Sequence, residues 1–325
     1  MNVMKVGNPP LDPETVCQMH ELWLTAFGHD FISDVPDDVL YGGEERWNYV
    51  NIYRHISEHQ TISTAIVIRP HALPALGGLG EVSTDPKFRG QGLATTTCEQ
   101  LAEDFYKSGG IALFLGTVNP DAARIYERLG WQHINRSRLM VRLSDTDDYD
   151  EFTRRYFDNS IPSKICVAKP GSRIPLIPLV LLPHNWSILD SNISLYSTSV
   201  EPQQSCLGLY RRYEYLRTHR QGEWFTLITK DERVLGISSA IHKGDNRYQV
   251  DGFCHSDHEN SFSKLIETAI DWCKSKKAAE ITFKIAKQDK SKEHLIRNVG
   301  FKTMNAEDYL ESDTMKTQSL LYSKI

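Results

Sequence analysis

The sequence lacks the features that mark membrane, secreted and nucleic-acid-binding proteins. Its longest apolar run, residues 174–183, is interrupted by prolines and is far too short to span a bilayer. The N-terminus has no apolar core of the kind found in signal peptides. There is no basic tract, and the formal net charge is −5, so we expect no nucleic-acid partner. These absences predict a cytoplasmic protein that does not bind membranes.

Disulfide and metal-binding patterns are also missing. The six cysteines are scattered without Cys-x-x-Cys spacing, which is typical of free, mostly structural thiols. Two histidines lie in the stretch His255–His258, but no matching ligand pair lies nearby, so we interpret this stretch as a polar loop. We therefore expect no metal.

The chain does contain enough residues and apolar side chains for two domains. With 325 residues, 40% of them hydrophobic, each half can bury its own core. An acidic stretch, residues 144–151, interrupts the apolar patterning, and we interpret it as part of a solvated connector. The predicted division is a first domain at 1–145, a connector at 146–171 and a second domain at 172–325.

The most informative segment is residues 81–94. An alternating, strand-like pattern ends at Pro86, and a helical pattern starts near Gln91. Between them, Gly90 and Gly92 have no Cβ, so backbone N–H groups can come close to a ligand, and the helix N-terminus adds partial positive charge. The segment predicts a site for phosphate or pyrophosphate. It is neither a dinucleotide fingerprint, which needs a third glycine, nor a P-loop, which needs Gly-Lys-Ser/Thr.

This turn contains Arg89-x-x-Gly92-x-Ala94, and here the sequence resembles the GNAT superfamily of N-acetyltransferases. In that family, Arg/Gln-x-x-Gly-x-Gly/Ala lies between a strand and a helix and holds the pyrophosphate of acetyl-CoA. A second run, residues 119–131, looks like another hallmark of the family, a helix that bears a tyrosine, here Tyr126, and ends in Gly-Phe or Gly-Trp. The two motifs stand at the expected separation, so the resemblance covers residues 1–143.

The resemblance implies that acetyl-CoA is the acyl donor and suggests which residues bind it. Amides between Phe88 and Ala94 would hold the pyrophosphate, with Arg89 adding positive charge. The preceding strand would pair with the pantetheine arm, and the Val82 N–H would donate to the developing oxyanion. The predicted acetyl-CoA site consists of Val82, Ser83, Thr84, Phe88, Arg89, Gly90, Gln91, Gly92, Leu93, Ala94 and Asn119.

Two side chains are candidates for proton transfer. Glu81 lies at the right end of its strand to accept a proton from an amine, directly or through a water, with Asp85 as a substitute. The other interpretation of Glu81 is a solvated or salt-bridged strand residue. In the family the Tyr126 phenol lies near the CoA sulfur and would protonate the leaving thiolate, whereas an isolated tyrosine would be a core aromatic. Asn119 either hydrogen-bonds the pantetheine or caps the helix that follows.

The order of the predicted elements fits a mixed, mostly antiparallel sheet with helices on both faces. An amphipathic helix ends near Phe27. The predicted strands are 50–56, 61–68, 79–85, 111–118 and 138–143, and the predicted helices are 91–108 and 121–129.

The second half repeats the first in degraded form. Aligning residues 281–287 with 111–117 gives an offset of 281 − 111 = 170, and the same offset places Gly300 on Gly130 without a gap. Three strands and a helical pattern precede this match, as in the first half. The prediction is an α/β (α+β) chain of two tandem GNAT-like domains, each a mixed, mostly antiparallel sheet flanked by helices.

The same offset shows what the second half lacks. No Gly-x-Gly occurs between residues 250 and 265, so the phosphate turn has been lost. We therefore predict that residues 172–325 form a degenerate copy that shapes the substrate cleft of the first. Arg89, Gly90, Gly92, Ala94 and Tyr126 map onto Glu259, Asn260, Phe262, Lys264 and Ile296.

The leading hypothesis is direct transfer of an acetyl group from acetyl-CoA to a primary amine of a small molecule. No cysteine lies in the signature strand or the tyrosine motif, so direct attack is simpler than a covalent acyl-enzyme. The alternatives are a protein or peptide N-acetyltransferase and a non-catalytic acyl-CoA-binding sensor or scaffold. The sequence does not reveal the acceptor, the acyl-chain preference or the oligomeric state.

Overall fold

The computed structural model describes residues 2–135, 137–146, 148–219, 221–311 and 316–324. The chain divides into two compact units. The first unit comprises residues 1–134, 138–152 and 204–208, and the second comprises 135–137, 153–203 and 209–325.

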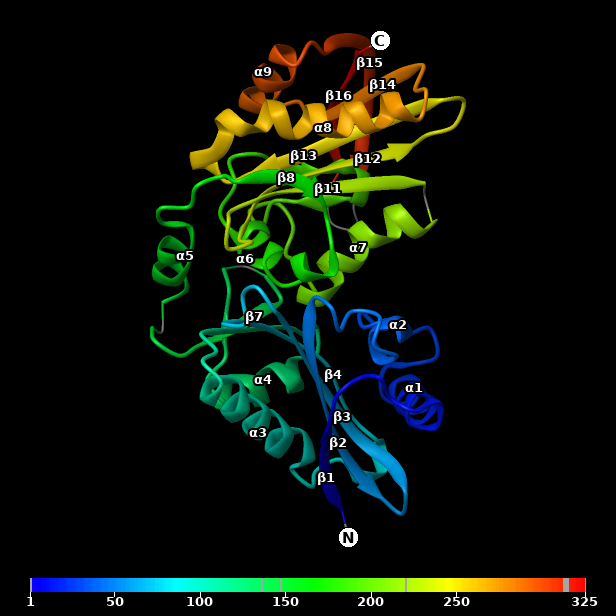
Figure 1. Cartoon of the computed structure of the whole chain (residues 1–325), viewed down its shortest axis with the longest axis vertical. Coiled ribbons are helices and arrows are strands. Elements are labelled where there is room, and N and C mark those ends of the chain that lie inside the picture. Colours follow the sequence, from blue (N-terminus) through cyan, green and yellow to red (C-terminus); the bar gives the residue numbers. More distant parts are fainter. Residues whose placement is uncertain (1, 136, 147, 220, 312–315, 325) are drawn as a thin grey trace. The chain divides into compact units, whose positions relative to one another are not determined.

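The first unit is built on a seven-stranded sheet of order β1-β2-β3-β4-β5-β7-β6. Neighbouring strands are antiparallel except β4 and β5, which are parallel. Helices α1 and α2 lie on one face of this sheet and α3 and α4 on the other (Figure 1). The elements are β1 (Val3–Gly7), α1 (Pro13–Phe27), α2 (Asp37–Leu40), β2 (Asn48–Ser57), β3 (Gln60–Pro70), β4 (Leu76–Thr84), α3 (Leu93–Lys107), β5 (Ala112–Gly116), α4 (Pro120–Arg128), β6 (Gln132–His133) and β7 (Leu139–Leu143).

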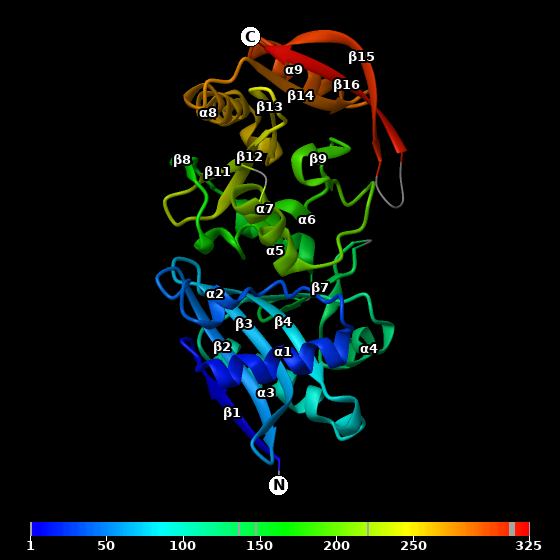
Figure 2. The same cartoon turned by 90° about the vertical axis from the view of Figure 1, so that its right-hand side faces the viewer.

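Helix α1 illustrates how the sequence sets the local structure. The Asp12 side chain caps its first turn by accepting from the Thr15 N–H at 2.9 Å, and Pro13 occupies the first helical position. Apolar residues at helical spacing, Val16, Met19 and Trp23 among them, bury one side against the sheet. Figure 2 shows α1 running across the front of the strands.

The second unit has a seven-stranded sheet of order β15-β16-β14-β13-β12-β11-β8. Again one neighbouring pair, β13 and β14, is parallel. A separate two-stranded ladder joins β9 and β10. The elements are β8 (Lys164–Val167), α6 (Leu176–Leu181), β9 (Ile188–Asp190), β10 (Leu195–Tyr196), β11 (Gly222–Ile228), β12 (Val234–His242), β13 (Arg247–Cys254), α8 (Phe262–Ser275), β14 (Glu280–Ala286), α9 (Lys290–Asn298), β15 (Lys302–Glu311) and β16 (Lys316–Lys324). Helices α5 (Tyr149–Phe157) and α7 (Cys206–His219) each contain residues of both units.

The two sheets share one topology, with the parallel pair in the same place. The offset seen in the sequence holds in the structure: the 3-10 helices η1 (Pro86–Phe88) and η4 (Ser256–Ser261) begin 256 − 86 = 170 residues apart, and α4 and α9 begin 290 − 120 = 170 apart. Each sheet is flanked by helices (Figure 1). The prediction of two tandem domains, each a mixed, mostly antiparallel sheet flanked by helices, is confirmed.

The expected connector, residues 146–171, is more ordered than a solvated linker. It contains α5, and β8 pairs with β11 at the edge of the second sheet. Asp150 and Glu151 stand in the first turn of α5, where negative charge complements the helix dipole. The last residues of the acidic stretch therefore begin a helix, and the boundary between the compact units falls between residues 152 and 153.

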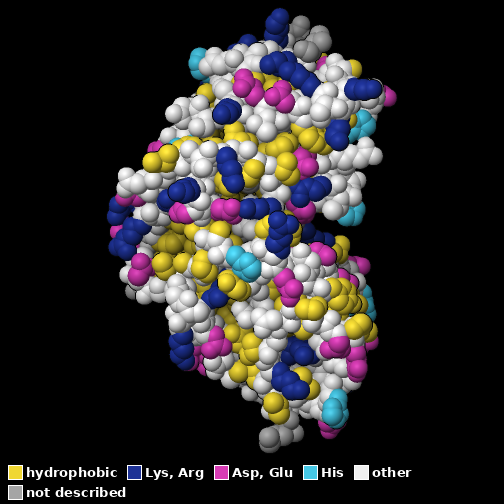
Figure 3. Space-filling model, viewed as in Figure 1, with side chains coloured by type: hydrophobic (Ala, Val, Ile, Leu, Met, Phe, Trp, Pro, Cys, Tyr) yellow, Lys and Arg dark blue, Asp and Glu magenta, His cyan; other side chains and the backbone are white. Residues whose placement is uncertain are grey.

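The surface of the folded chain carries charges of both signs, as its composition predicts. On the face drawn in Figure 3, Lys and Arg side chains are interspersed with Asp and Glu in both units. In the parts of the chain that the structure describes, none of the helices has the length and apolar character needed to cross a bilayer.

Candidate active site

Strand β4 departs from regular pairing at Glu81 and Val82. The register between β3 and β4 shifts between Thr64 and Ile66, so two residues of β4 together face one residue of β3. Glu81 has a φ of 53°, a left-handed conformation that is costly for a residue with a Cβ. A bulge of this kind redirects the side chain that it carries.

The bulge is held by a buried hydrogen-bond network. The Thr64 hydroxyl donates to the Glu81 carbonyl at 2.7 Å and accepts from the Trp23 indole N–H at 2.9 Å. A further 2.8 Å hydrogen bond joins it to the Ser83 hydroxyl. Because Trp23 and Thr64 are fully buried, this network keeps the strained backbone in one conformation.

The Glu81 carboxylate is bound through one oxygen and open at the other. Its Oε1 accepts from the Ser33 hydroxyl at 2.6 Å and from the N–H groups of Asp34 and Val35 at 3.0 and 3.3 Å. Oε2 receives none of these bonds. Among the described residues no donor is bonded to Oε2, so Oε2 is the oxygen left to take a proton.

Burial raises the pKa of Glu81 to about 7. The charge of Asp34 also raises it, while the Ser33 hydroxyl and the amides of Asp34 and Val35 oppose the rise by stabilising the carboxylate. A carboxyl group with this pKa is about half ionised at pH 7. It therefore has the basicity suited to a general base at neutral pH.

The turn after β4 forms an open cradle. Asp85 caps η1 by accepting from the Lys87 N–H at 2.8 Å, so this substitute base is already used in the backbone turn. Gly90 and Gly92 have φ values of 76° and 78°, and Gly92 is the N-cap of α3. A Cβ at either glycine would meet nothing within 4 Å, so space lies open in front of both. Only glycine adopts this backbone at little cost.

Free amides line this cradle. In the described chain, the N–H groups of Gly90, Gln91 and Gly92 donate to no acceptor. The amides of Leu93 and Ala94 stand in the first turn of α3, where helices have no internal acceptor. Such an array fits the oxygens of a diphosphate, and the α3 dipole adds to the attraction.

Arg89 lies on the rim of this cradle. Its guanidinium donates to the Thr84 carbonyl at 3.3 Å and to the Ala26 carbonyl at 3.5 Å. No described carboxylate lies within ion-pair distance of it, so its positive charge is not neutralised by the protein. The exposed guanidinium can approach a bound anion.

The edge of β4 that faces β5 is unpaired beside the bulge. The parallel pairing of these strands ends at Gly78 and Phe114. Towards β3, by contrast, the Ser83 carbonyl accepts from the Ser63 hydroxyl at 2.7 Å. The backbone of Val82, Ser83 and Thr84 thus offers one edge to an extended ligand, in the manner of strand addition.

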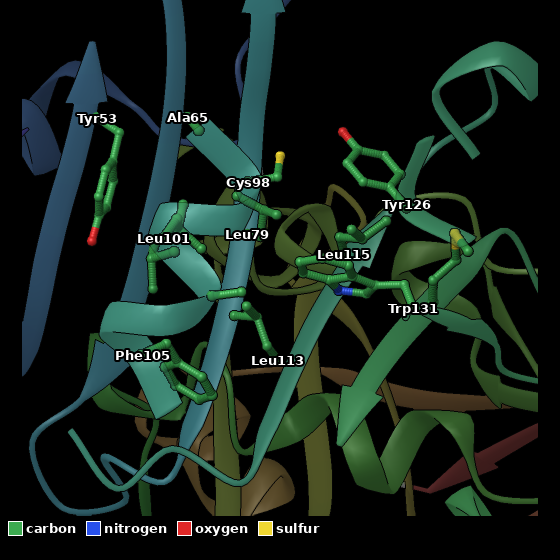
Figure 4. Packing of buried hydrophobic residues seen from close by; sticks show 13 residues of the cluster. Tyr53, Ala65, Leu79, Cys98, Leu101, Phe105, Leu113, Leu115, Tyr126 and Trp131 are labelled. Atoms are coloured by element: carbon green, nitrogen blue, oxygen red, sulfur yellow. The ribbon is translucent and has the colours of Figure 1, made fainter. Parts of the chain in front are cut away.

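Tyr126 lies on α4 at the border of the hydrophobic core. Its ring packs edge-on against Trp131, with ring centroids 5.9 Å apart, and only 7% of the residue is exposed. Figure 4 shows its hydroxyl directed away from Trp131, on the side of the Cys98 sulfur. Burial, and secondarily Cys98, raises the pKa of Tyr126 well above 10, so the phenol keeps its proton. Its hydroxyl donates to no acceptor in the described residues.

Asn119 is a helix cap in this structure. Its side-chain oxygen accepts from the Asp121 N–H at 2.9 Å, at the start of α4. Its Thr117 neighbour accepts from the Asn119 N–H at 3.2 Å. A role in binding pantetheine would have to use the side-chain NH₂ group.

The second unit has no counterpart of the cradle. After β13, η4 contains Asp257 and Glu259 where the first unit has a basic turn. No described residue from 255 to 262 has a positive φ, and α8 starts from Ser261 in a right-handed conformation. Two carboxylates in a turn that lacks a positive-φ residue are unsuited to a diphosphate.

The second unit also lacks a free carboxylate at the position that corresponds to Glu81. By the offset of 170, Glu81 corresponds to Asp251, which forms a 2.7 Å ion pair with Lys292, and both side chains are fully buried. Asp251 also accepts from the N–H and hydroxyl of Ser191 at 2.7 and 2.6 Å. With both oxygens bonded, Asp251 has no site for an incoming proton.

The structure brings some of the predicted site residues together along one segment and leaves others on a separate helix. Glu81, the 82–84 edge and the 88–94 turn follow one another along a single strand, turn and helix. Tyr126 and Asn119 come from α4, and no contact of Tyr126 with Glu81 is described. Ser33, Asp34 and Val35, which bind Glu81, were missed. The sequence contains no motif or periodicity that marks them.

A comparison with known protein families finds a match to the part of the chain that contains both motifs. The model of the family described as FR47-like protein matches residues 52–140, which contain both motifs. No protein of the curated set is similar enough in sequence to count as a match.

Solved acetyltransferase structures are similar to about half of this chain. The ribosomal-protein-S5-alanine acetyltransferase from Vibrio fischeri is 15% identical, with 52% of this chain and 97% of that chain covered and a TM-score of 0.39. A GNAT-family acetyltransferase from Staphylococcus aureus is 17% identical, with 50% and 97% covered and a TM-score of 0.39. A spermidine N-acetyltransferase chimera from Vibrio cholerae is 13% identical, with 49% and 93% covered and a TM-score of 0.37.

The family match and the two described sheets agree with the interpretation of the motifs. The matched region runs from β2 into β7 and includes the bulge, the cradle and Tyr126. Residues 52–140 are therefore similar to the FR47-like family, and this match agrees with the interpretation of the two motifs.

Proposed function

We propose that the first unit is an acetyl-CoA-dependent N-acetyltransferase that transfers the acetyl group directly to a primary amine of a small molecule. One observation carries the proposal: a carboxylate with a pKa of about 7 and one unbonded oxygen stands on the same strand that leads into a turn of free amides. The free amides suit the diphosphate of the donor, and the carboxylate suits the proton of the acceptor.

Each step can be assigned to a group of this chain. Glu81 Oε2 accepts the proton that the amine loses as its nitrogen forms the new bond to the acetyl carbon. The Val82 N–H is the proposed donor to the acetyl oxygen, which gains negative charge in that step. The Tyr126 hydroxyl gives its proton to the sulfur as the carbon–sulfur bond breaks. The buried phenol is protonated at every physiological pH, which supports this last role.

The charge of the surrounding loop favours an acceptor that is cationic in solution. Residues 28–48 contain six carboxylates and one arginine, in a chain whose total net charge is −5. A loop of this sign attracts an ammonium ion, which must lose one proton to solvent before its neutral form attacks and gives the second proton to Glu81. The acidic residues of the loop are Asp30, Asp34, Asp37, Asp38, Glu44 and Glu45.

The test is acetyl-CoA binding followed by turnover on the full chain. Isothermal titration should give one site per chain. Thiol release should then be measured with polyamines, amino sugars, amino acid derivatives and a peptide with a free N-terminus. Turnover with a small amine supports the proposal. Turnover with the peptide alone would make the acceptor a protein, and binding without turnover across the panel would indicate a sensor.

A further inference from the structure

A short segment from the later part of the chain belongs to the first unit. Residues 204–208 group with it, although the residues before and after them, 153–203 and 209–325, belong to the second unit. Helix α7 begins inside this segment, at Cys206. The first unit is therefore incomplete without residues that a truncation after 152 would remove.

The segment lies across the opening between β4 and β5. Pairing of the two strands ends two residues before Gly80 on β4 and Gly116 on β5. A Cβ at Gly80 would come within 2.5 Å of the Leu207 side chain, and a Cβ at Gly116 within 2.7 Å of the Gln204 carbonyl oxygen. Both glycines thus allow the segment to sit directly on the parted strands.

Ser205 connects this segment to the residues that hold Glu81. Its hydroxyl donates to the carboxylate of Asp34 and accepts from the Gly208 N–H at 3.0 Å. The Asp34 backbone N–H in turn donates to Glu81 Oε1 at 3.0 Å. Asp34 is therefore fixed at its side chain by Ser205 while its backbone binds the proposed base.

Leu207 packs against the backbone one residue before the same glutamate. It is 2% exposed, and its side chain covers Gly80, the residue immediately before Glu81. The neighbouring Cys206 thiol is buried 3.9 Å from the Leu79 carbonyl. Because Leu207 is buried against Gly80, a smaller side chain at 207 would leave a cavity next to the residue that precedes Glu81.

We propose that Leu207 determines which amines the first unit accepts and that Ser205 is a positioning residue for Glu81, acting through Asp34. The inference rests on the proposed N-acetyltransferase function. The size of residue 207 sets the room next to Glu81 Oε2. The hydrogen bond from Ser205 to Asp34 holds residues 33–35 in place. Glu81 Oε1 therefore stays bonded to them, and Glu81 Oε2 stays free.

The first experiment changes the size of residue 207. Leu207→Ala, with Leu207→Val as a milder variant that keeps the fold, is assayed with the best amine of the panel and with homologues one carbon longer and shorter. The ratio of kcat/KM for the longer to the shorter amine should rise about tenfold or more. Acetyl-CoA affinity, measured by titration, should stay unchanged.

The second experiment changes the link to Asp34. Ser205→Ala should raise the pKa that governs the acid limb of kcat/KM, because Glu81 Oε1 is then held less well. Ser205→Thr keeps the hydroxyl and should restore the natural profile. Ser199→Ala, a serine on the same stretch that belongs to the second unit, is the matched control and should leave the profile unchanged.

The outcomes separate this inference from the proposed function. A natural protein that neither binds acetyl-CoA nor releases thiol would overturn both. An active natural enzyme overturns this inference alone if the folded residue-207 variants keep the natural ratio of amine preferences, or if Ser205→Ala keeps the natural acid limb.

Discussion

Removing the Ser33 hydroxyl should move the pH profile of the enzyme without touching the substrate. This hydroxyl donates to Glu81 Oε1 at 2.6 Å, the shortest of the three bonds to that oxygen. Ser33→Ala leaves the carboxylate in its buried position but with one donor fewer. Because burial is what raises the pKa of Glu81 to about 7, and the hydroxyl opposes that rise, the pKa must increase in the variant.

The size of the change follows from the geometry. A hydrogen bond to a charged group is worth about 1.5–3 kcal/mol, and about 1.4 kcal/mol corresponds to one pKa unit. The Ser33 hydroxyl can also donate to the Val35 carbonyl at 2.8 Å, so the lower value applies. The pKa should rise by about one unit, and the ionised fraction of Glu81 at pH 7 should fall from about one half to about one tenth.

The assay is kcat/KM for the amine between pH 5.5 and 9.5. At pH 7 Ser33→Ala should be about fivefold slower than the natural enzyme, and above pH 9 the two should converge. Ser108→Ala, which removes another part-buried serine hydroxyl of the first unit that bonds a carbonyl, should keep the natural profile. An acid limb that stays in place in the folded Ser33→Ala protein would refute Glu81 as the base.

Three further changes test other parts of the site. Glu81→Gln should lower kcat/KM by about 10²- to 10⁴-fold. It should also stabilise the protein relative to the natural chain as pH rises from 4.5 through 7, by roughly 3 kcal/mol in denaturant unfolding, because a folded-state pKa of about 7 makes the ionised native carboxylate increasingly costly there. Tyr126→Phe should lower kcat about 10- to 100-fold with little change in acetyl-CoA affinity, measured by titration. Gly92→Ala should weaken acetyl-CoA binding in the same titration, because the amides of the cradle lose their positions.

Matched controls make these tests specific. Gly109 also has a positive φ, 87°, and open space at its Cβ, so Gly109→Ala carries a similar backbone cost at the other end of α3. It should bind acetyl-CoA normally. Equal loss of affinity in both glycine variants would show that Gly92 matters only for folding. An unchanged rate in Tyr126→Phe would remove the phenol from the mechanism.

Local patterns predicted the first sheet and the turn that follows β4 well. The alternating residues before Pro86 form β4, the glycines of the turn have the predicted open backbone, and helices α3 and α4 lie where periodicity indicated them. These features depend on neighbours in sequence, such as the Asp85 cap and the positive φ of Gly92. The offset of 170 was equally informative, because a duplicated unit keeps its spacing.

Long-range contacts explain what the sequence could not predict. Strand β1, at residues 3–7, exists because it pairs with β2 about 50 residues later, and its exposed alternation is weak. Ser33 and Ser205 reach the site through hydrogen bonds spanning 48 and 171 residues. No periodicity or motif marks such partners. The same applies to Lys292, whose pairing with Asp251 closes the carboxylate position of the second unit.

A crystal structure of the full chain with bound coenzyme A would test the central claim most directly. The account predicts the diphosphate on the amides of residues 90–94, with the pantetheine along the free edge of Val82–Thr84. Coenzyme A bound instead at η4 of the second unit, or away from both turns, would contradict it.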